Sequence, residues 1–203
     1  MANNFKNSFA SIVTAGENYQ SVGAATDNHT GPQLIYRAHD GSSGVNSILV
    51  ELDAANTGTT GISVTAFIQD TSATLGTITS ITSSASDVAT VVCASDHGMQ
   101  TGQYVHVTGS TAHYVNGIYK ITVTSATNFT YQQHASAGDG AAAGTNKVIY
   151  KAYHIVKDVP IPASSTLKII AGQKVVLNSE DKVYAYASAA HCDVIAGILQ
   201  GVS

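Results

Sequence analysis

A dense series of short alternating segments, each closed by a glycine- or asparagine-bearing turn, constrains this chain more than any other feature of its sequence. The clearest examples are residues 97–109, 116–123 and 128–131. Apolar and polar residues alternate there with a period of two, which places successive side chains on opposite faces of a strand. Turns that contain glycine or asparagine are typical of the connections between such strands. The pattern therefore predicts an all-β protein.

The region from about residue 78 to residue 145 has the pattern of a self-contained β unit. It interrupts a second β-rich pattern that continues on both sides of it. Its four or five short strands are typical of a small barrel or sandwich. It ends in the small-residue stretch 135–145, which has no periodicity and is expected to be a loop or linker. We predict a discontinuous scaffold, 1–77 plus 146–203, and a small inserted β domain, 78–145.

The scaffold segments follow one another at the 8–12-residue rhythm expected of a β-sandwich, here of a jelly-roll-like kind. In the region 62–70, for example, Ile62, Val64 and Ala66 share one face. Strands are predicted over residues 33–38, 45–52, 62–70, 147–159, 166–170, 175–177, 183–187 and 194–199.

Three local features of the scaffold carry further expectations. Proline cannot donate a hydrogen bond to a sheet, so Pro160-Ile161-Pro162 is predicted to end the strand before it. Ala171-Gly172 is predicted to be a turn. In residues 5–13, Phe5 and Phe9 stand at helical spacing, and this piece is either a short helix or an extended arm.

The composition limits the functions open to the chain. Charged residues make up only 11% of it, hydrophobic residues 44%, and the net charge is −4. No basic patch for nucleic acid is visible, no apolar run reaches membrane-spanning length, and no signal-peptide core is present, so we expect folding in a cytoplasm. A surface of uncharged polar residues favours a chain packed against neighbours; a soluble β domain with such a surface is the alternative.

Two stretches resemble known phage proteins. Residues 157–177, with a proline-ended strand, a Ser-Thr-Leu strand and the turn Gly172-Gln173-Lys174, resemble small virion proteins of tailed bacteriophages, as does the opening 1–7. This chain has Glu180-Asp181 where those proteins usually have Gly-Asp, which implies a different turn geometry. The region 78–145, with its His-Gly-x-x-Thr-Gly opening and Asn-Gly-x-Tyr centre, resembles modules of phage tail and adhesion proteins.

The resemblance implies a virion structural protein, assembled in the host cytoplasm, without enzymatic activity or cofactor. It implies a homo-oligomer, with a trimer favoured, that decorates or cements the capsid and contacts virion proteins such as the major capsid or tail proteins. A neck, collar or tail protein is the first alternative. A carbohydrate-binding or host-attachment module is the second.

Candidate interface residues follow from aromatic side chains that suit protein contacts. Phe5 and Phe9 are expected to reach a neighbouring subunit from the N-terminal arm. Tyr104, His113 and Tyr114 are expected on the inserted unit, where a shallow groove lined by them would favour the glycan-binding alternative.

No residue pattern predicts a catalytic or metal site. The histidines of the inserted region lack ligand spacing such as HxH and have no carboxylate cluster beside them; they are His97, His106, His113 and His134. Neighbouring strand residues point to opposite faces, so His191-Cys192-Asp193 cannot form a catalytic triad. Asp139 and Asp181 lack the carboxylate density of a calcium loop. Cys93 and Cys192 are expected to be buried free thiols.

Overall fold

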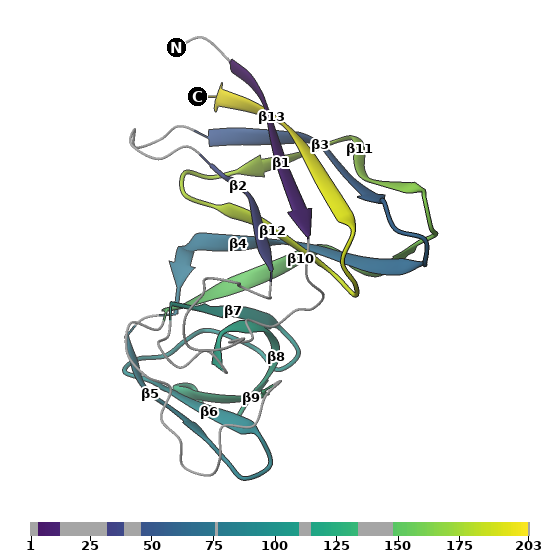
Figure 1. The fold of residues 1–203 in the computed structure, drawn as a ribbon. Coiled ribbons are helices and arrows are strands. Elements are labelled where there is room, and N and C mark those ends of the chain that lie inside the picture. The colour runs from purple at the N-terminus through teal and green to yellow at the C-terminus, as the bar shows by residue number, and fades with distance from the viewer. Residues whose placement is uncertain are drawn as a thin grey trace. The chain divides into compact units, whose positions relative to one another are not determined.

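The computed structural model describes residues 4–12, 32–38, 46–75, 77–109, 115–133 and 148–202. Thirteen strands lie in these residues, and the strand pairs whose register is defined are antiparallel, which confirms the all-β prediction. The chain divides into two compact units (Figure 1). Among the described residues, the first unit contains the N-terminal strand, Pro32–Ser72 and the chain from Tyr153 onward, and the second contains Ala73–Ala152.

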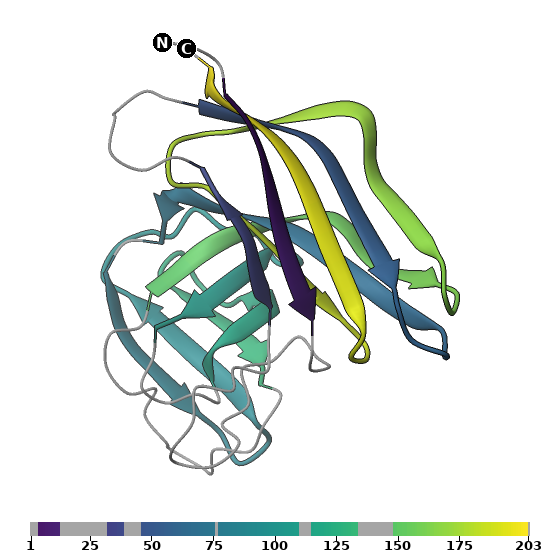
Figure 2. The same ribbon diagram turned by 45° about the horizontal axis from the view of Figure 1, so that its top comes forward.

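The first unit is a β-sandwich, as predicted. One sheet has the order β1 (Asn4–Ile12), β13 (Cys192–Val202), β3 (Asn46–Asn56) and β11 (Thr166–Leu177) (Figures 1 and 2). The other has the order β2 (Gln33–Arg37), β12 (Lys182–Ala187), β4 (Ile62–Thr74) and β10 (Val148–Ile161). Both sheets contribute alternate side chains to one core, among them Leu49 and Ala196 from the first and Val64 and Ala185 from the second.

The second unit is one curled antiparallel sheet. Its order is β10, β7 (Tyr104–Thr108), β8 (Gly117–Val123), β9 (Asn128–Gln132), β6 (Val88–Cys93) and β5 (Ile78–Ser83). Each of these strands places side chains in a single core, so the sheet wraps around it; Val107, Ile121, Phe129, Val91 and Ile81 are examples. The buried ring of Tyr119 stacks on that of Tyr131, with 4.2 Å between centroids.

The structure decides the N-terminal segment in favour of the extended alternative. Residues Asn4–Ile12 form strand β1, which pairs along its whole length with β13 from Asn4–Gln200 to Ile12–Cys192. Ile12 is 1% exposed and joins the sandwich core. The helical spacing of Phe5 and Phe9 is also even spacing, so both residues fall on the same face of a strand.

Of two predicted breaks in the scaffold, the one at Pro160-Ile161-Pro162 ends the strand two residues later than predicted, and the one at Gly172 is wrong. Strand β10 runs through Pro160 to Ile161. Its register with β7 stops at Ala152, so beyond that residue β4 is its only neighbour among the described strands, and an edge strand accommodates proline. Strand β11 runs past Gly172 as a bulge, because its register with β3 jumps between Ala171 and Val175.

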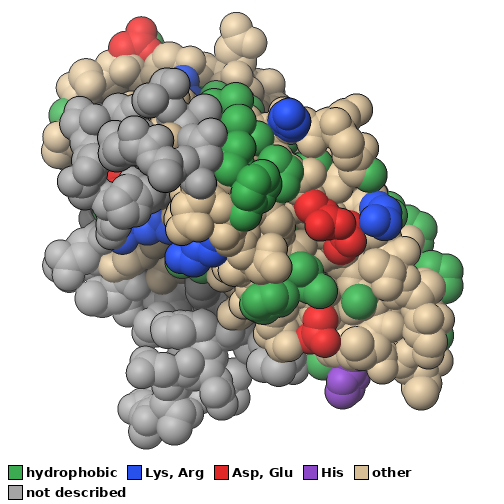
Figure 3. Space-filling model, turned by 90° about the horizontal axis from the view of Figure 1, so that it is seen from above, with side chains coloured by type: hydrophobic (Ala, Val, Ile, Leu, Met, Phe, Trp, Pro, Cys, Tyr) green, Lys and Arg blue, Asp and Glu red, His purple; other side chains and the backbone are tan. Residues whose placement is uncertain are grey.

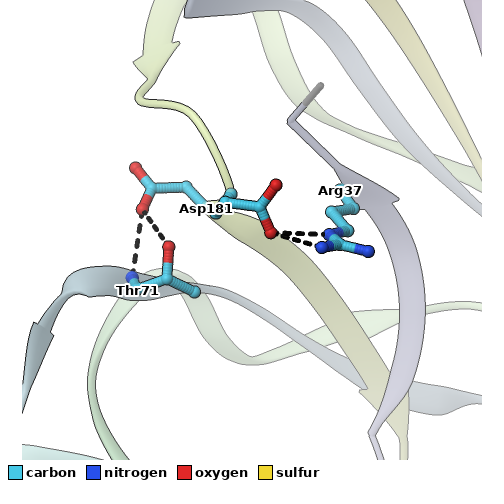
Figure 4. Close-up of polar contacts among 4 residues, drawn as sticks. Arg37, Thr71 and Asp181 are labelled. Atoms are coloured by element: carbon cyan, nitrogen blue, oxygen red, sulfur yellow. Dashed lines mark hydrogen bonds and ion pairs between the residues drawn. The ribbon is translucent and has the colours of Figure 1, made fainter. Parts of the chain in front are cut away.

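The turn at Glu180-Asp181 is stabilised by its own side chains (Figure 4). Asp181 is buried, and its Oδ2 accepts a hydrogen bond from the backbone N–H of Asn178 at 2.9 Å. Its Oδ1 accepts from the backbone N–H of Thr71 on strand β4 at 3.1 Å. Glu180 adopts φ = 76° and accepts from Arg37 Nε at 2.9 Å. Glutamate thus occupies the left-handed conformation that glycine adopts more readily.

Both cysteines are buried free thiols, as expected. Burial raises the pKa of the Cys93 thiol. Burial, with a further contribution from the charge of Asp193, raises the pKa of Cys192 to about 11. Within the described part of the chain, no helix is long and apolar enough to cross a membrane.

Candidate interaction surface

The exposed aromatic residues of the scaffold lie on strand β1. Phe5 is 76% exposed and Phe9 is 69% exposed. The alternate positions point inward, where Ile12 enters the core and the Ser8 hydroxyl donates to the carbonyl oxygen of Ile35 at 2.5 Å. The polarity of this strand is therefore the reverse of an ordinary surface strand, since its largest apolar side chains face solvent.

Strand register extends the apolar surface from Phe5 across the whole four-stranded sheet. Phe5 pairs with Leu199, Leu199 pairs with Ile48, and Ile48 pairs with Val176. Directly paired residues of antiparallel strands share a face. Val176 is 60% exposed, and Leu199 and Ile48 are half-buried. One complete row on the outer face of this sheet is thus apolar.

A second apolar pair lies four residues further along the first two strands. Phe9 pairs with Ile195, which is 42% exposed, and Asn7 pairs with Gly197 between the two apolar rows. Phe5, Leu199, Phe9 and Ile195 therefore occupy the corners of a rectangle around Asn7 and Gly197. We call these four residues the apolar block.

Charged residues border the apolar block on the third and fourth strands. Ile195 pairs with Asp53, and Asp53 pairs with Lys168. The Nζ atom of Lys168 lies 3.7 Å from Glu51 Oε1 and 4.0 Å from Asp53 Oδ2. The pKa of Asp53 is raised, mainly by burial. The charge of Lys168 lowers it, and the charge of Glu51 raises it further. Figure 3 shows apolar groups on this face with acidic and basic side chains beside them.

The other predicted interface residues belong to the second unit or lie outside the described residues. Tyr104 begins β7 and is half-buried, between Lys120 on β8 and Ala152 on β10. His113 and Tyr114 lie outside the described residues. The structure therefore places Phe5 and Phe9 together on one surface, and the predicted groove of Tyr104, His113 and Tyr114 involves residues outside those described.

The described histidines of the second unit serve its architecture. His97 Nε2 lies 3.1 Å from the carbonyl oxygen of Ser125, and its Nδ1 accepts a hydrogen bond from the backbone N–H of Met99 at 3.0 Å. The ring packs edge-on against Phe129. His106 is fully buried in β7. Across the described residues, no three His, Cys, Asp or Glu side chains converge as a metal site would require.

The remaining polar candidates have structural contacts. His191 is exposed at the turn before β13 with φ = 70°, whereas Cys192 is fully buried, so the two side chains diverge. Asp193 accepts a hydrogen bond from the hydroxyl of Ser11. Asp181 is committed to the backbone of its turn, and Asp139 lies outside the described residues.

Comparison with known proteins gives no family assignment. No family model matches the chain, and no curated protein matches it. Among solved structures, the phage phi92 endosialidase aligns with a TM-score of 0.32 and 24% identity. The alignment covers 38% of this chain and 12% of that protein.

Sequence reasoning identified Phe5 and Phe9 but missed Ile195, Leu199 and Val176. These three residues lie far from strand β1 in the sequence, and only the register brings them beside it. One sequence signal was available. The predicted strand 194–199 contains several consecutive apolar residues instead of a strict alternation, which indicates apolar side chains on both faces.

Proposed function

We propose that this chain is a structural protein of a tailed-phage virion, acts by packing against neighbouring subunits and has no enzymatic activity. Within that class we propose a capsid decoration or cement protein. The observation that carries the proposal is the apolar outer face of the β1-β13-β3-β11 sheet, where Phe5, Phe9 and Val176 are exposed. Only 11% of the residues of the whole chain are charged.

Physical arguments support a role in assembly. A soluble monomer usually keeps its largest apolar patch to a few hundred square ångströms, and patches of that size often mark contact sites. The low charge provides little electrostatic repulsion between copies at high local concentration. Asp181 and His97 make hydrogen bonds to the backbone of their turns.

The specific assignment to a phage rests on the resemblance of residues 1–7, 78–145 and 157–177 to phage proteins. At Glu180-Asp181, where this chain departs from the pattern, Glu180 adopts a positive φ and the turn connects β11 with β12. A neck, collar or tail position remains the alternative within the same class, and the host-attachment role remains the alternative outside it.

Quantitative mass spectrometry of purified virions carrying this protein tests the proposal. The measurement is the number of copies per particle, relative to the major capsid protein. Decoration of an icosahedral lattice predicts a count on the order of hundreds, because the symmetry multiplies each site. A count of roughly three to twelve would move the protein to the neck or tail, where symmetry is cyclic. Its absence from virions would overturn the structural role, and glycan binding would then be measured.

A further inference from the structure

We infer that the apolar block, Phe5, Phe9, Ile195 and Leu199, binds the same block on a second copy of this chain across a two-fold axis. The inference rests on the proposed structural role, because it names the partner of the surface described above. It concerns the outer face of the β1-β13 strand pair within the first unit.

The available apolar area is of the size that such a contact needs. Phe5 and Phe9 are 76% and 69% exposed. With roughly 200 Å² for each buried aromatic side chain, the two expose about 300 Å². A standard interface buries about 800 Å² per partner, of which about 450 Å² is apolar. Ile195, at 42% exposure, and half-buried Leu199 add to the area of the phenylalanines.

The arrangement of the block is complementary to itself. Its four side chains stand at the corners of a rectangle, with Asn7 and Gly197 at the centre. A two-fold axis that lies in the plane of the contact, through this centre and along the strands, places corners on corners and keeps the Glu51 carboxylates of the two copies apart. Every apolar side chain then meets an apolar side chain, as an isologous interface requires. Gly197 has no side chain of its own, and the Glu51 side chain lies beside it, with Cβ 3.3 Å from the position that a Cβ atom of Gly197 would take.

The border of the block favours a copy of this chain over a strongly charged partner. None of the four residues of the block is charged. Glu51 pairs with Gly197, and its Oε2 lies 3.6 Å from the position that a Cβ atom of Gly197 would take. Lys168 Nζ lies 3.7 Å from Glu51 Oε1 and offsets this charge. A partner with a strongly basic or acidic surface would leave its charges against Phe5 and Ile195, and desolvation of unpaired charges is unfavourable. The uncharged block of a second copy imposes no such cost.

Sedimentation equilibrium of the purified full chain over a wide concentration range tests this inference. We expect a reversible species of twice the 20.9 kDa mass of one chain. Replacing both Phe5 and Phe9 with serine is expected to raise the dissociation constant at least about 100-fold, since buried aromatic anchors dominate interface energies. The matched control is Leu34→Ser, which removes an exposed apolar side chain (47%) from β2 of the other sheet and is expected to leave the mass unchanged.

Charge variants at the centre test the symmetry itself. Asn7→Lys and Asn7→Asp each bring like charges together at the two-fold axis, so each variant alone is expected to remain monomeric. Mixing the two is expected to restore the dimer, because opposite charges then meet. Asn7 is exposed on β1, so both variants are expected to fold.

The outcomes separate this inference from the proposed function. A wild-type chain that stays monomeric, or forms only a trimer unaffected by the serine substitutions, would overturn the two-fold contact. The trimer implied by the sequence resemblance and this two-fold pair are different assemblies, and the measured mass distinguishes them. A monomer that is nevertheless abundant in virions would contradict only the inference, whereas absence from virions would contradict the proposed function.

Discussion

Single residues with left-handed backbone conformations form several of the turns in this chain. Glu180, His191, Ser164 and Asp87 all have positive φ, at turns between consecutive strands. Such a conformation costs roughly 1–2 kcal/mol for a residue with a Cβ atom. At the β11–β12 turn, Glu180 also forms an ion pair with Arg37, and a pair between such partly exposed side chains offsets at most part of this cost. At the residue scale, therefore, turn geometry is set by neighbours and not by glycine alone.

Substitution at Glu180 separates backbone strain from the ion pair. Glu180→Gly and Glu180→Ala both remove the contact with Arg37, but only glycine relaxes the positive φ. We expect the glycine variant to be more stable than the alanine variant by about 0.5–1 kcal/mol, because relief of strain exceeds the entropic cost of glycine. Urea unfolding of the two variants measures the difference, and equal stabilities would show that this turn is not strained.

Gly117 explains the Asn-Gly-x-Tyr pattern of the second unit. Its φ is 150°, and a Cβ atom there would lie 3.0 Å from the Cζ and Oη atoms of Tyr119. The Tyr119 hydroxyl donates to the carbonyl oxygen of Asn116 at 3.0 Å, so the ring folds back over the glycine. The glycine therefore makes room for the ring that stacks on Tyr131.

Alanine substitutions at two glycines test this interpretation. Gly117→Ala is expected to destabilise the protein by about 2–3 kcal/mol through backbone strain and displacement of Tyr119. Gly98→Ala is the matched control, because Gly98 also has a positive φ (59°) but no atom lies within 4 Å of the position that a Cβ atom would take. We expect about 1 kcal/mol for the control. Thermal unfolding checks both values, and equal losses would contradict a steric role for Tyr119.

Ionisation of the Cys192 thiol is expected to lower the stability of the protein at alkaline pH. Its pKa rises from 9.0 to about 11 in the fold, mainly because it is buried. Above pH 9 the thiol ionises in the unfolded chain but stays protonated in the folded one, and this favours the unfolded state. The free energy of unfolding is therefore expected to fall as the pH rises from 9 towards 11. Urea unfolding at several pH values, for the wild type and Cys192→Ala, measures this effect. An identical pH dependence in the two proteins would contradict it.

Strand β1 shows how one element serves both the core and the surface. Ile12 is 1% exposed and packs in the sandwich core, while Asn7, on the same strand, faces solvent. The same alternation turns Phe5 and Phe9 outward. The N-terminal segment, for which the sequence allowed either a helix or an extended arm, is therefore a strand of the sheet. It also carries two of the four residues of the apolar block, Phe5 and Phe9.

Two substitutions on β1 test its attachment to the sheet. Ile12→Ala is expected to cost about 2–4 kcal/mol, because it removes buried methylene and methyl groups and leaves a cavity. Asn7→Ala is expected to change stability by less than about 0.5 kcal/mol, as usual for an exposed position. Urea unfolding at a dilution where the chain is monomeric makes the comparison. A small effect of Ile12→Ala would mean that β1 is a loosely attached arm.

Whole-molecule organisation depends on two strands that leave one unit and enter the other. Strand β4 ends at Thr74 and β10 begins at Val148, and the two are neighbours in the sheet order. Close to these ends, the backbone N–H of Leu75 donates to the carbonyl oxygen of Ile149 at 3.2 Å. The chain thus departs and returns at adjacent points. The domain boundaries at 78 and 145 stay a prediction about independent folding.

Deleting the inserted region tests that prediction. Replacement of residues 78–145 with a short Gly-Ser bridge is expected to leave a scaffold that unfolds cooperatively, because its core residues all come from outside the deletion, as Leu49, Val64 and Val183 do. Circular dichroism during urea unfolding, compared with the full chain, gives the measurement. A gradual, non-cooperative transition would show that the scaffold needs the second unit in order to fold.

The sequence by itself determined the all-β class, the sandwich and most of the strands. Alternation is a local property, so residues such as Ile62, Val64 and Ala66 indicate a buried strand face without knowledge of the partner strand. The same local information identified Phe5 and Phe9 as candidates for an interface. It placed the end of β10 two residues early and failed at Gly172, since whether a proline or a bulge interrupts a strand depends on which strands lie beside it.

Only the tertiary structure decided the register and hence the candidate surface. Phe9 and Ile195 are 186 positions apart but directly paired, and no local pattern specifies which distant strand supplies the neighbour. A shift of one residue in that pairing would turn Ile195 inward, and the four residues of the apolar block would no longer share one face. Side-chain alternation is thus present in the sequence, whereas the alignment of alternating strands emerges only when the core residues of both sheets pack together.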